Sequence, residues 1–367
     1  MKIAFVHDWL TGMRGGEKVL DALCERFPAA ELFTLVHVRG SVSPAIERMK
    51  PHTSFVQRMP FVKQLYRVYL PLFPAAVEQF DLDGFDLIVS TSHCCVKSIV
   101  RPGRARHLCY CLTPMRYAWD QFDAYFGADR ISAPGRYAMR KAMAWLARWD
   151  RDTSGRADRY VAISHYVAGR VRRYYNREAS VVYPPVDTDF FSPAPLTSQA
   201  AAAGSPYALV VSALVPYKRV AVAIEACRIA GIPLKIVGDG PERARLERAS
   251  QGDVTFFGRR SDEEVRDLYR AAAVTLLPGE EDFGIVPVEA QACGSPVVAL
   301  GRGGALETVL PDETGVLVDD PSVPAFADGI GRAMSRRFDP GLIRRHAEGF
   351  SRERFSDEMA ALITADA

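Results

Sequence analysis

Short apolar runs alternate with amphipathic helical patterns along this chain, and the alternation occurs in two separate series. The first series has strand-like runs at residues 3–7, 87–91, 107–111 and 160–163. The second has strand-like runs at residues 208–212, 234–237, 254–257, 274–277 and 297–300. Helical patterns lie between the runs, which is typical of parallel sheets covered by helices on both faces. We therefore predict an α/β protein with two Rossmann-like domains in tandem.

A stretch without clear periodicity separates the two series. It extends from Pro184 to Pro206 and contains Pro193-Ala194-Pro195, a composition that favours a linker and a surface loop. We predict three parts: an N-terminal domain at 1–187, a second domain at 188–345, and a C-terminal helix within 346–367 that packs back toward the N-terminal domain. Since open α/β sheets bind ligands beyond the carboxyl ends of their strands, we expect two facing domains with the active site in a deep cleft between them.

Charge is distributed unevenly between the two halves of the chain. The net charge of +2 over 367 residues conceals 27 basic and 19 acidic residues in 1–190, against 19 basic and 25 acidic residues in 191–367. The first half therefore favours an acidic partner. The seven cysteines form no Cys-x-x-Cys pair, which indicates reduced thiols. With no apolar run of about 18 residues, we expect a cytoplasmic protein, peripheral at most on the inner face of the membrane.

Two glutamates stand at the end of the strand-like run 274–277. Glu281 lies in the turn that follows this run, and Glu289 lies eight residues later on a helix expected to begin near Gly284. A turn that leads into a helix points free backbone N–H groups at an anion. Carboxylates accept hydrogen bonds from sugar hydroxyls. The combination predicts a site for a nucleotide-sugar, with its diphosphate at the helix N-terminus.

Several motifs together resemble the retaining family 4 glycosyltransferases of GT-B fold. They are this glutamate pair, Gly15-Gly16-Glu17, and the segments 182–187, 216–219 and 237–242. Within the family, segments 113–120 and 215–219 resemble mannosyltransferases of bacterial O-antigen and exopolysaccharide assembly. The resemblance implies a retaining, metal-independent transfer of mannose from GDP-mannose to a polyprenyl-diphosphate-linked saccharide. It implies no cofactor beyond this donor substrate and no nucleic-acid partner.

The resemblance also implies a role for individual residues. Glu281 would contact the donor hexose near its anomeric carbon, and Glu289 would bind the ribose. Lys218 and Arg219 would stabilise the charge that develops on the departing diphosphate. A larger set would offer backbone groups to the nucleotide or the sugar: Gly15, Gly16, Gly238, Gly240, Phe283, Gly284 and Ile285.

Two positions depart from the family pattern. Ala213 stands where many relatives carry an arginine, and Leu112 stands where relatives often carry a histidine. His93 is the nearest replacement for that histidine, although a core role fits it better. The alternatives are therefore a UDP-sugar-dependent glycosyltransferase, a non-catalytic nucleotide-sugar-binding protein, and an epimerase of the same fold. An NAD oxidoreductase is disfavoured, because no Gly-x-Gly-x-x-Gly follows the first strand.

Further residues are candidates on the acceptor side or for a metal. Asp8, Arg116 and Trp119 fall on the predicted acceptor side, where structural roles explain them equally well. Two Asp-x-Asp elements mimic a metal site, namely Asp81-Leu82-Asp83 and Asp187-Thr188-Asp189. Both fall in loop or linker segments, and no His/Cys cluster has the spacing of metal ligands. We therefore predict no bound metal.

Two basic, aromatic segments lie in the positively charged half. They cover residues 58–73 and 136–151. Segments of this kind can lie on an anionic lipid surface. An ordinary amphipathic helix with its apolar side in the core explains the same pattern.

Overall fold

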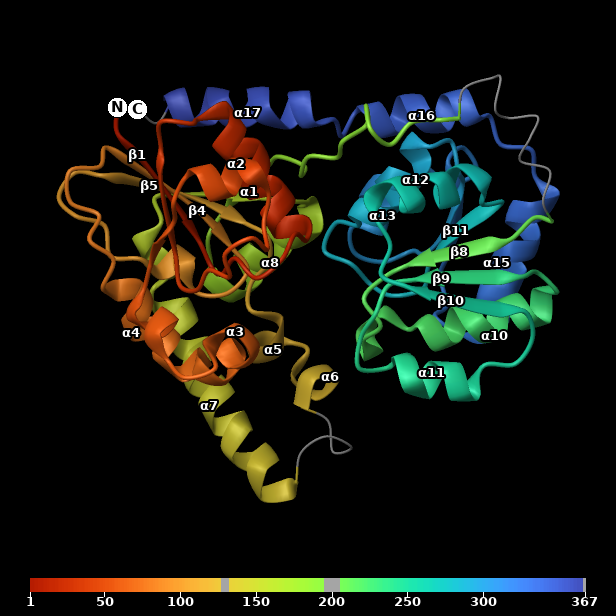
Figure 1. The fold of residues 1–367 in the computed structure, drawn as a ribbon, viewed down its shortest axis with the longest axis horizontal. Helices are drawn as coiled ribbons and strands as arrows, with labels where there is room; N and C mark the ends of the chain where they lie inside the picture. The colour runs from red at the N-terminus through yellow and green to blue at the C-terminus, as the bar shows by residue number, and fades with distance from the viewer. Residues whose placement is uncertain (127–131, 195–204, 366–367) are drawn as a thin grey trace. The chain divides into compact units, whose positions relative to one another are not determined.

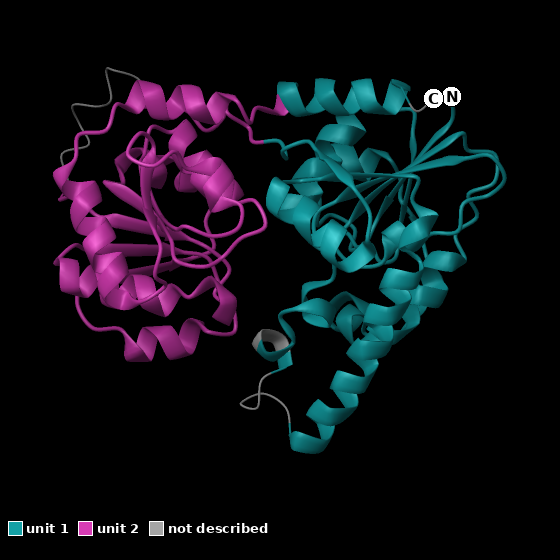
Figure 2. Cartoon of the chain, turned by 180° about the vertical axis from the view of Figure 1, so that it is seen from behind, with its two compact units in different colours: residues 1–185, 353–367 teal, residues 186–352 magenta. Residues whose placement is uncertain are grey.

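The computed structural model describes residues 1–126, 132–194 and 205–365, which form two compact units (Figures 1 and 2). Unit 1 comprises residues 1–185 and the C-terminal residues from 353 onward, and unit 2 comprises 186–352. The chain therefore passes between the units twice, after Pro185 and after Arg352. The sequence placed these junctions at 187 and 345. No helix of the described residues is long and apolar enough to cross a membrane.

A seven-stranded parallel sheet forms the centre of unit 1. Its strand order is β3-β2-β1-β4-β5-β6-β7, and every neighbouring pair runs parallel. The inner strands β1 and β4 are buried along their whole length, as expected for a sheet covered on both faces. The strands are β1 Ile3–His7, β2 Glu31–Thr34, β3 His52–Thr53, β4 Leu87–Ser92, β5 Arg106–Cys111, β6 Arg159–Ala162 and β7 Ala179–Val181.

Helices and short 3₁₀ turns surround this sheet. The helices are α1 Gly15–Arg26, α2 Pro44–Arg48, α3 Val62–Leu65, α4 Phe73–Glu78, α5 Arg116–Trp119, α6 Phe122–Phe126, α7 Ala133–Asp152, α8 His165–Tyr175 and α17 Arg352–Ala365. The 3₁₀ turns are η1 Phe55–Arg58, η2 Tyr66–Leu72, η3 Val96–Ser98 and η4 Ser154–Arg156. The last helix, α17, adds to this first unit, where Phe355 packs edge-on against Tyr110 with ring centroids 5.6 Å apart.

Unit 2 repeats the architecture with six parallel strands in the order β10-β9-β8-β11-β12-β13. The strands are β8 Ala208–Val211, β9 Leu234–Val237, β10 Val254–Gly258, β11 Val274–Leu277, β12 Val297–Leu300 and β13 Gly315–Val318. The helical elements are η5 Pro216–Lys218, α10 Val220–Ala230, α11 Arg243–Ala249, α12 Asp262–Ala271, α13 Ile285–Ala292, α14 Ala305–Thr308, α15 Val323–Ser335 and α16 Pro340–Glu348. Apolar side chains of α10 and α15 share one core cluster with the strands.

The two sheets confirm the predicted α/β fold with two Rossmann-like domains. The nine strand-like runs of the sequence correspond to β1, β4, β5, β6, β8, β9, β10, β11 and β12. The strands that the sequence did not indicate include the exposed two-residue β3 and the three-residue edge strand β7. Such short strands leave too few positions to show a pattern.

Each sheet reverses its strand order at one point. In unit 1, β1 lies between β2 and β4; in unit 2, β8 lies between β9 and β11. Open α/β sheets bind ligands outside the carboxyl ends of the strands at such a switch point. The topology therefore indicates the β1/β4 end of unit 1 and the β8/β11 end of unit 2.

Candidate active site

Two loops meet at the carboxyl ends of β8 and β11. They approach so closely that Gly279 has no room for a side chain. A Cβ atom there would lie 2.6 Å from the carbonyl oxygen of Tyr217 and 2.8 Å from the Cα atom of Lys218. Backbone atoms cannot move aside as a flexible side chain can. Glycine at position 279 therefore permits the contact between the two loops.

This contact brings together the side chains of Lys218 and Glu281. The Lys218 ammonium donates a hydrogen bond to the Glu281 carboxylate and forms an ion pair with it. The two side chains are only 17% and 12% exposed, so their charges interact more strongly than they would on an open surface. The structure thus joins two of the three residues predicted to act in catalysis. Their catalytic role stays a prediction.

A third loop, after β12, holds the Glu281 turn from the other side. Glu281 forms an isolated parallel bridge with Gly303, and its carbonyl oxygen accepts a hydrogen bond from the N–H of Gly304 at 2.8 Å. A Cβ atom on Gly303 would lie 2.3 Å from the Glu281 carbonyl oxygen, and one on Gly304 would lie 2.3 Å from the Phe283 Cα atom. The turn that carries Glu281 is therefore fixed between two neighbouring loops.

The loop after β9 extends the same edge of the sheet. Gly238 has φ +125°, a left-handed conformation that favours glycine. A Cβ atom there would lie 1.9 Å from the Ser212 carbonyl oxygen, and one on Gly240 would lie 2.4 Å from that of Leu214. Both predicted nucleotide-binding glycines therefore pack against the loop after β8, next to the Lys218 segment.

The helix after the Glu281 turn is α13, and its N-cap is Gly284 with φ +95°. Phe283 is buried and packs edge-on against Phe350, with ring centroids 5.6 Å apart. Ile285 is the first helical residue. Backbone N–H groups at such a helix start suit an anion. The helix therefore begins where the sequence indicated.

Glu289 lies on α13, in the second turn of the helix. The residue is 6% exposed, and its Oε2 accepts a hydrogen bond from the Tyr269 hydroxyl at 3.3 Å. Burial, and next the charge of Glu289, hold the pKa of Tyr269 well above its usual value, so the phenol stays a donor. The hydrogen bond from Tyr269 thus orients the carboxylate of Glu289, the residue predicted to bind the ribose.

Arg219 occupies the link between η5 and α10. Its φ of +55° is left-handed, and its guanidinium donates to the Pro321 carbonyl oxygen at 3.0 Å. A guanidinium has five N–H donors, so this bond is compatible with the contact to a diphosphate that the sequence suggested. That contact stays a prediction.

Asp8, which follows β1, lies at the switch point of unit 1. Its buried carboxylate accepts four hydrogen bonds from consecutive backbone N–H groups of residues 93–96, at 2.7 to 3.1 Å. These bonds tie the end of β1 to the loop after β4. The structure therefore gives Asp8 a structural role.

The predicted glycine loop of unit 1 opens helix α1. Gly15 is its first residue, and a Cβ atom on Gly16 would lie 2.8 Å from the Leu112 Cδ1 atom and 3.6 Å from the His7 Cε1 atom. Glu17, in the first turn of the helix, is buried, and burial raises its pKa from 4.5 to about 7. The four loops described above belong to unit 2, whereas these two glycines belong to unit 1.

Trp119, a candidate on the acceptor side, is held in a buried network. Its indole N–H donates to Asp150 at 2.8 Å, and its ring stacks on Tyr174 with centroids 4.6 Å apart. Asp150 also accepts from the Tyr175 hydroxyl at 2.8 Å and pairs with the Lys97 ammonium at 2.9 Å. The structure thus gives Trp119 a packing role.

Two family descriptions match the chain, and together they cover most of it. The family described as Glycosyltransferase Family 4 matches residues 13–190, and the family described as Glycosyl transferases group 1 matches residues 197–348. The chain has the GT-B fold, and its two halves are similar to two glycosyltransferase families. Each match corresponds to one of the two Rossmann-like domains of this GT-B protein.

Curated relatives of this GT-B protein include two D-inositol 3-phosphate glycosyltransferases. The protein of Mycobacteroides abscessus is 31% identical over 228 residues, which cover 57% of this chain and 49% of the relative. That of Mycobacterium bovis is 35% identical over 208 residues, which cover 49% of this chain and 42% of the relative. The match therefore spans about half the length of these relatives or less.

Solved structures resemble the GT-B protein over its whole length. Sucrose-phosphate synthase from Thermosynechococcus elongatus has a TM-score of 0.73 at 21% identity and covers 100% of this chain and 99% of its own. The Anabaena protein HepE in complex with UDP has a TM-score of 0.69 at 19% identity and covers 100% of both chains. These similarities confirm the GT-B fold.

The two departures from the family pattern lie in different units of the GT-B protein. Ala213 is exposed in the loop after β8, and Leu112 is buried beside Gly16. His93 is half-buried against Trp9, with ring centroids 4.4 Å apart and its Nδ1 atom 3.2 Å from Asp8. Desolvation lowers the pKa of His93, which favours a neutral imidazole. This packing agrees with the core role that the sequence favoured.

One group of described residues has the donor types that metals prefer. Oxygen or sulfur atoms of Asp8, Cys94 and Cys95 lie within 4.8 Å of one another. However, four backbone N–H groups already occupy the Asp8 carboxylate. Burial also raises the pKa of both thiols, which disfavours the thiolate that binds metal. This cluster is therefore a poor metal site.

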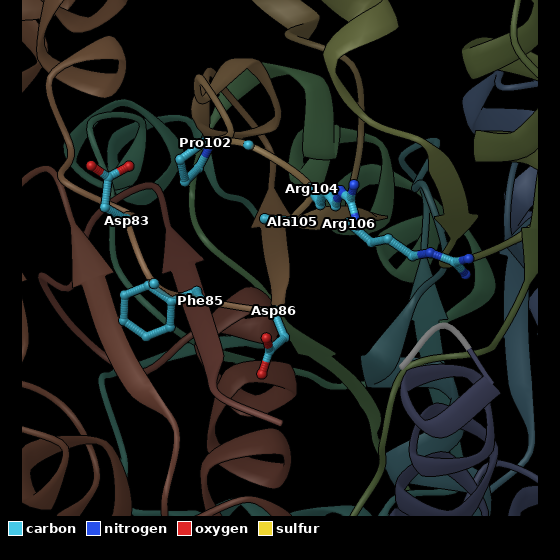
Figure 3. Close-up of a pocket in the computed structure, with 9 residues that line it drawn as sticks. Asp83, Phe85, Asp86, Pro102, Arg104, Ala105 and Arg106 are labelled. Atoms are coloured by element: carbon cyan, nitrogen blue, oxygen red, sulfur yellow. The ribbon is translucent and has the colours of Figure 1, made fainter.

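A shallow pocket of about 430 Å³ lies elsewhere on unit 1 (Figure 3). It is lined by residues 83–86, which precede β4, and by residues 102–106, which lead into the first residue of β5. These are the amino ends of the strands, opposite the ligand-binding edge of a parallel sheet. Asp83, one of the Asp-x-Asp residues, lies on this pocket and therefore apart from the switch point.

Sequence reasoning missed the residues that position the candidate site. Gly279, Gly303 and Gly304 allow three loops to touch, and Tyr269 orients Glu289. The glycine pair in Gly301-Arg302-Gly303-Gly304 was a visible signal of close backbone approach. Nothing in the sequence marked Tyr269, because its contact depends on how α12 packs against α13.

Proposed function

We propose that this chain transfers a hexose from a nucleotide-sugar to a lipid-linked saccharide, with retention of the anomeric configuration. The observation that carries the proposal is the Lys218–Glu281 pair, held between three glycine-containing loops at the switch point of unit 2. An ammonium at this position suits a diphosphate, and a carboxylate beside it suits sugar hydroxyls.

In the proposed reaction, an acceptor hydroxyl attacks the anomeric carbon from the side of the leaving group. The new glycosidic C–O bond forms as the bond between the sugar and the β-phosphate oxygen breaks. The acceptor proton passes to the departing diphosphate. Lys218, Arg219 and the start of α13 stabilise the growing negative charge, so the transfer would proceed without a metal.

The donor we propose is GDP-mannose, on the resemblance of segments 113–120 and 215–219. A UDP-sugar is the second candidate, because the similar HepE structures are described in complex with UDP and with UDP-glucose. The acceptor we propose is a polyprenyl-diphosphate-linked saccharide of bacterial surface polysaccharide synthesis. We place the reaction at the cytoplasmic face of the membrane.

A nucleotide screen followed by a transfer assay tests the proposal. Thermal unfolding would be measured with GDP, UDP, GDP-mannose and UDP-glucose, because a ligand that binds the folded chain raises its stability by mass action. The best donor would then be incubated with a lipid-linked acceptor, with and without EDTA. Failure of all four nucleotides to raise the unfolding temperature would overturn the proposed function, and isomerisation of the donor without acceptor would indicate an epimerase.

A further inference from the structure

An apolar stripe stands exposed on unit 1 along α3 and η2. Its members, Phe61, Leu65, Val68 and Leu72, are 38% to 76% exposed. Phe61 and Leu65 lie four residues apart across α3, and Leu65 and Val68 lie three apart at the start of the 3₁₀ segment η2, spacings that place each pair on one side of its helix. Phe61 has a left-handed φ of +51° and is the most exposed of the four. A non-glycine residue in this conformation is costly, and here it does not bury the ring.

The opposite side of the same segment is anchored in the core. Val62, Tyr66 and Phe73 are buried in the main cluster of unit 1. Tyr69 hydrogen-bonds to the Pro60 carbonyl oxygen at 2.8 Å. The stripe is therefore carried by a packed element and faces outward, the reverse of an ordinary amphipathic helix with a polar outer side.

The charged residues of the segment that carries the stripe all have one sign. No aspartate or glutamate occurs between Glu47 and Glu78, whereas this interval holds five basic residues: Arg48, Lys50, Arg58, Lys63 and Arg67. Arg58, Lys63 and Arg67 are exposed. A polycationic surface with protruding apolar side chains complements an anionic surface with an apolar interior.

The other basic segment, α7, differs in the burial of its apolar residues and in the pairing of its charges. Its apolar residues Met143 and Leu146 are buried in the same cluster of unit 1. Arg136 and Arg140 both pair with Asp123. The exposed Tyr137 and Trp145 of α7 therefore stand on a helix whose charge is partly neutralised.

We infer that the stripe and the bases Arg58, Lys63 and Arg67 form a docking surface for an anionic phospholipid bilayer. This inference rests on the proposed function only for its purpose, which is to bring a lipid-linked acceptor to the protein. The four apolar side chains insert among the lipids, and the three bases contact the phosphates. The surface belongs to α3 and η2 and not to α7.

The surface is continuous with the switch point of unit 1. Tyr66, on the inner side of η2, packs on Trp9 with ring centroids 5.3 Å apart. Trp9 in turn packs on His93, beside Asp8. Arg14, Arg67 and Arg116 all act electrostatically on His93. The docking surface therefore adjoins the carboxyl ends of β1 and β4, where a lipid diphosphate would meet several arginines.

Co-sedimentation with sucrose-loaded vesicles tests the inference. The full chain would be mixed with vesicles of phosphatidylcholine alone, or of phosphatidylcholine with phosphatidylglycerol, at low and high salt. We expect salt-sensitive binding to the anionic vesicles only. In the Leu65→Glu/Val68→Glu variant, and in the Lys63→Glu/Arg67→Glu variant, we expect binding to weaken by about tenfold or more.

Two matched variants locate the surface. Ile229→Glu changes an equally exposed apolar residue on α10 of unit 2, and Trp145→Glu changes the exposed tryptophan of α7. Both are expected to bind vesicles like the wild type. Loss of binding in Trp145→Glu but not in Leu65→Glu/Val68→Glu would overturn the assignment. Failure of the wild-type chain to bind anionic vesicles would also overturn it. So would a result in which the stripe variants bind vesicles normally and differ from the wild type only because a dimer dissociates into monomers, as measured by sedimentation velocity.

Nucleotide binding, measured by thermal shift on the same samples, separates this inference from the proposed function. Three of the variants change unit 1, and Ile229→Glu changes an exposed residue of α10 outside the candidate site, so all four are expected to keep the wild-type response to the best nucleotide. A chain that binds nucleotide but no vesicles refutes the docking surface alone. A chain that binds vesicles through the stripe but no nucleotide supports the surface and refutes the glycosyltransferase.

Discussion

At the scale of single residues, Lys218 and Glu281 form an ion pair with each other that a bound substrate could replace. In the proposed reaction, a sugar hydroxyl would donate to the Glu281 carboxylate and a phosphate would accept from Lys218, so that two substrate contacts would replace one ion pair. The free-energy cost of separating the pair is then offset by charge-assisted hydrogen bonds of similar kind. The pair thus keeps both side chains oriented before substrate enters.

Removal of either charge is expected to slow transfer. Glu281→Ala and Lys218→Ala should each lower kcat by about 100-fold, the effect of losing one oriented electrostatic group. Because the residues act as a pair, the double variant should lose less than the two effects combined. Steady-state transfer kinetics measure this. Glu280→Ala, the matched control, should stay close to the wild type; a larger loss in Glu280→Ala than in Glu281→Ala would reassign the site.

Glu17 should make stability depend on pH. Its pKa is raised from 4.5 to about 7 by burial, so the folded chain holds this proton more tightly than the unfolded chain. The stabilisation is complete below pH 4.5 and is lost as the pH rises through about 7. Relative to Glu17→Gln, the free energy of unfolding of the wild type should fall by about 3 kcal/mol over this interval. Urea unfolding at several pH values checks it, and parallel curves for the two proteins would contradict it.

The candidate residues were predictable from sequence, and their contacts were not. Glu281 and Glu289 followed from their spacing across a turn and a helix start. The pairing of Glu281 with Lys218 depends on β8 lying next to β11. Residues 218 and 281 are far apart in the chain, and local patterns carry no information on strand order.

At the scale of elements, the loop contact at Gly279 is the most sensitive point. Gly279→Ala should abolish transfer, because its Cβ atom would be forced into the backbone of residues 217 and 218. Gly331→Ala, within α15, meets no atom within 4 Å. This control should be active and more stable by up to about 1 kcal/mol. Kinetics with thermal unfolding distinguish the two; a fully active Gly279→Ala would show that the loops need not touch.

The Asp150 network should dominate the stability of the α5–α7 region. Asp150→Asn leaves the Lys97 ammonium, which is 1% exposed, without its negative partner. We expect the free energy of unfolding to fall by about 3–5 kcal/mol, measured in urea. Asp123→Asn removes the exposed pairs with Arg136 and Arg140 and should change stability little. Equal effects of the two substitutions would mean that the buried pair is not special.

Elements with a strong local pattern were predicted well, and the others were not. The strands β1, β4 and β11 are wholly apolar or buried and stand out in the sequence. Helix α17 begins at Arg352, within the predicted C-terminal helix, and joins unit 1 as expected, but its individual contacts, such as that of Phe355 with Tyr110, could not be predicted. Tertiary packing supplies that information, and periodicity does not.

At the scale of the whole molecule, nucleotide protection should be confined to one edge of one sheet. In hydrogen exchange with the best nucleotide, we expect slower exchange in residues 212–219, 238–240 and 279–289. These are the loops after β8, β9 and β11, together with most of α13. Residues 83–86 and 102–106, around the pocket of Figure 3, should exchange at an unchanged rate. Protection of that pocket instead would move the nucleotide site to unit 1.

The return of the chain to unit 1 has a consequence for its synthesis. Phe355, Met359 and Ile363 are fully buried residues of α17, and they reach unit 1 only after the whole of unit 2 has been translated. Until those residues have been synthesised, the sheet of unit 1 lacks the contact of Phe355 with Tyr110. Unit 2 is continuous in the chain, so it can complete its fold before unit 1 does, although it is synthesised later.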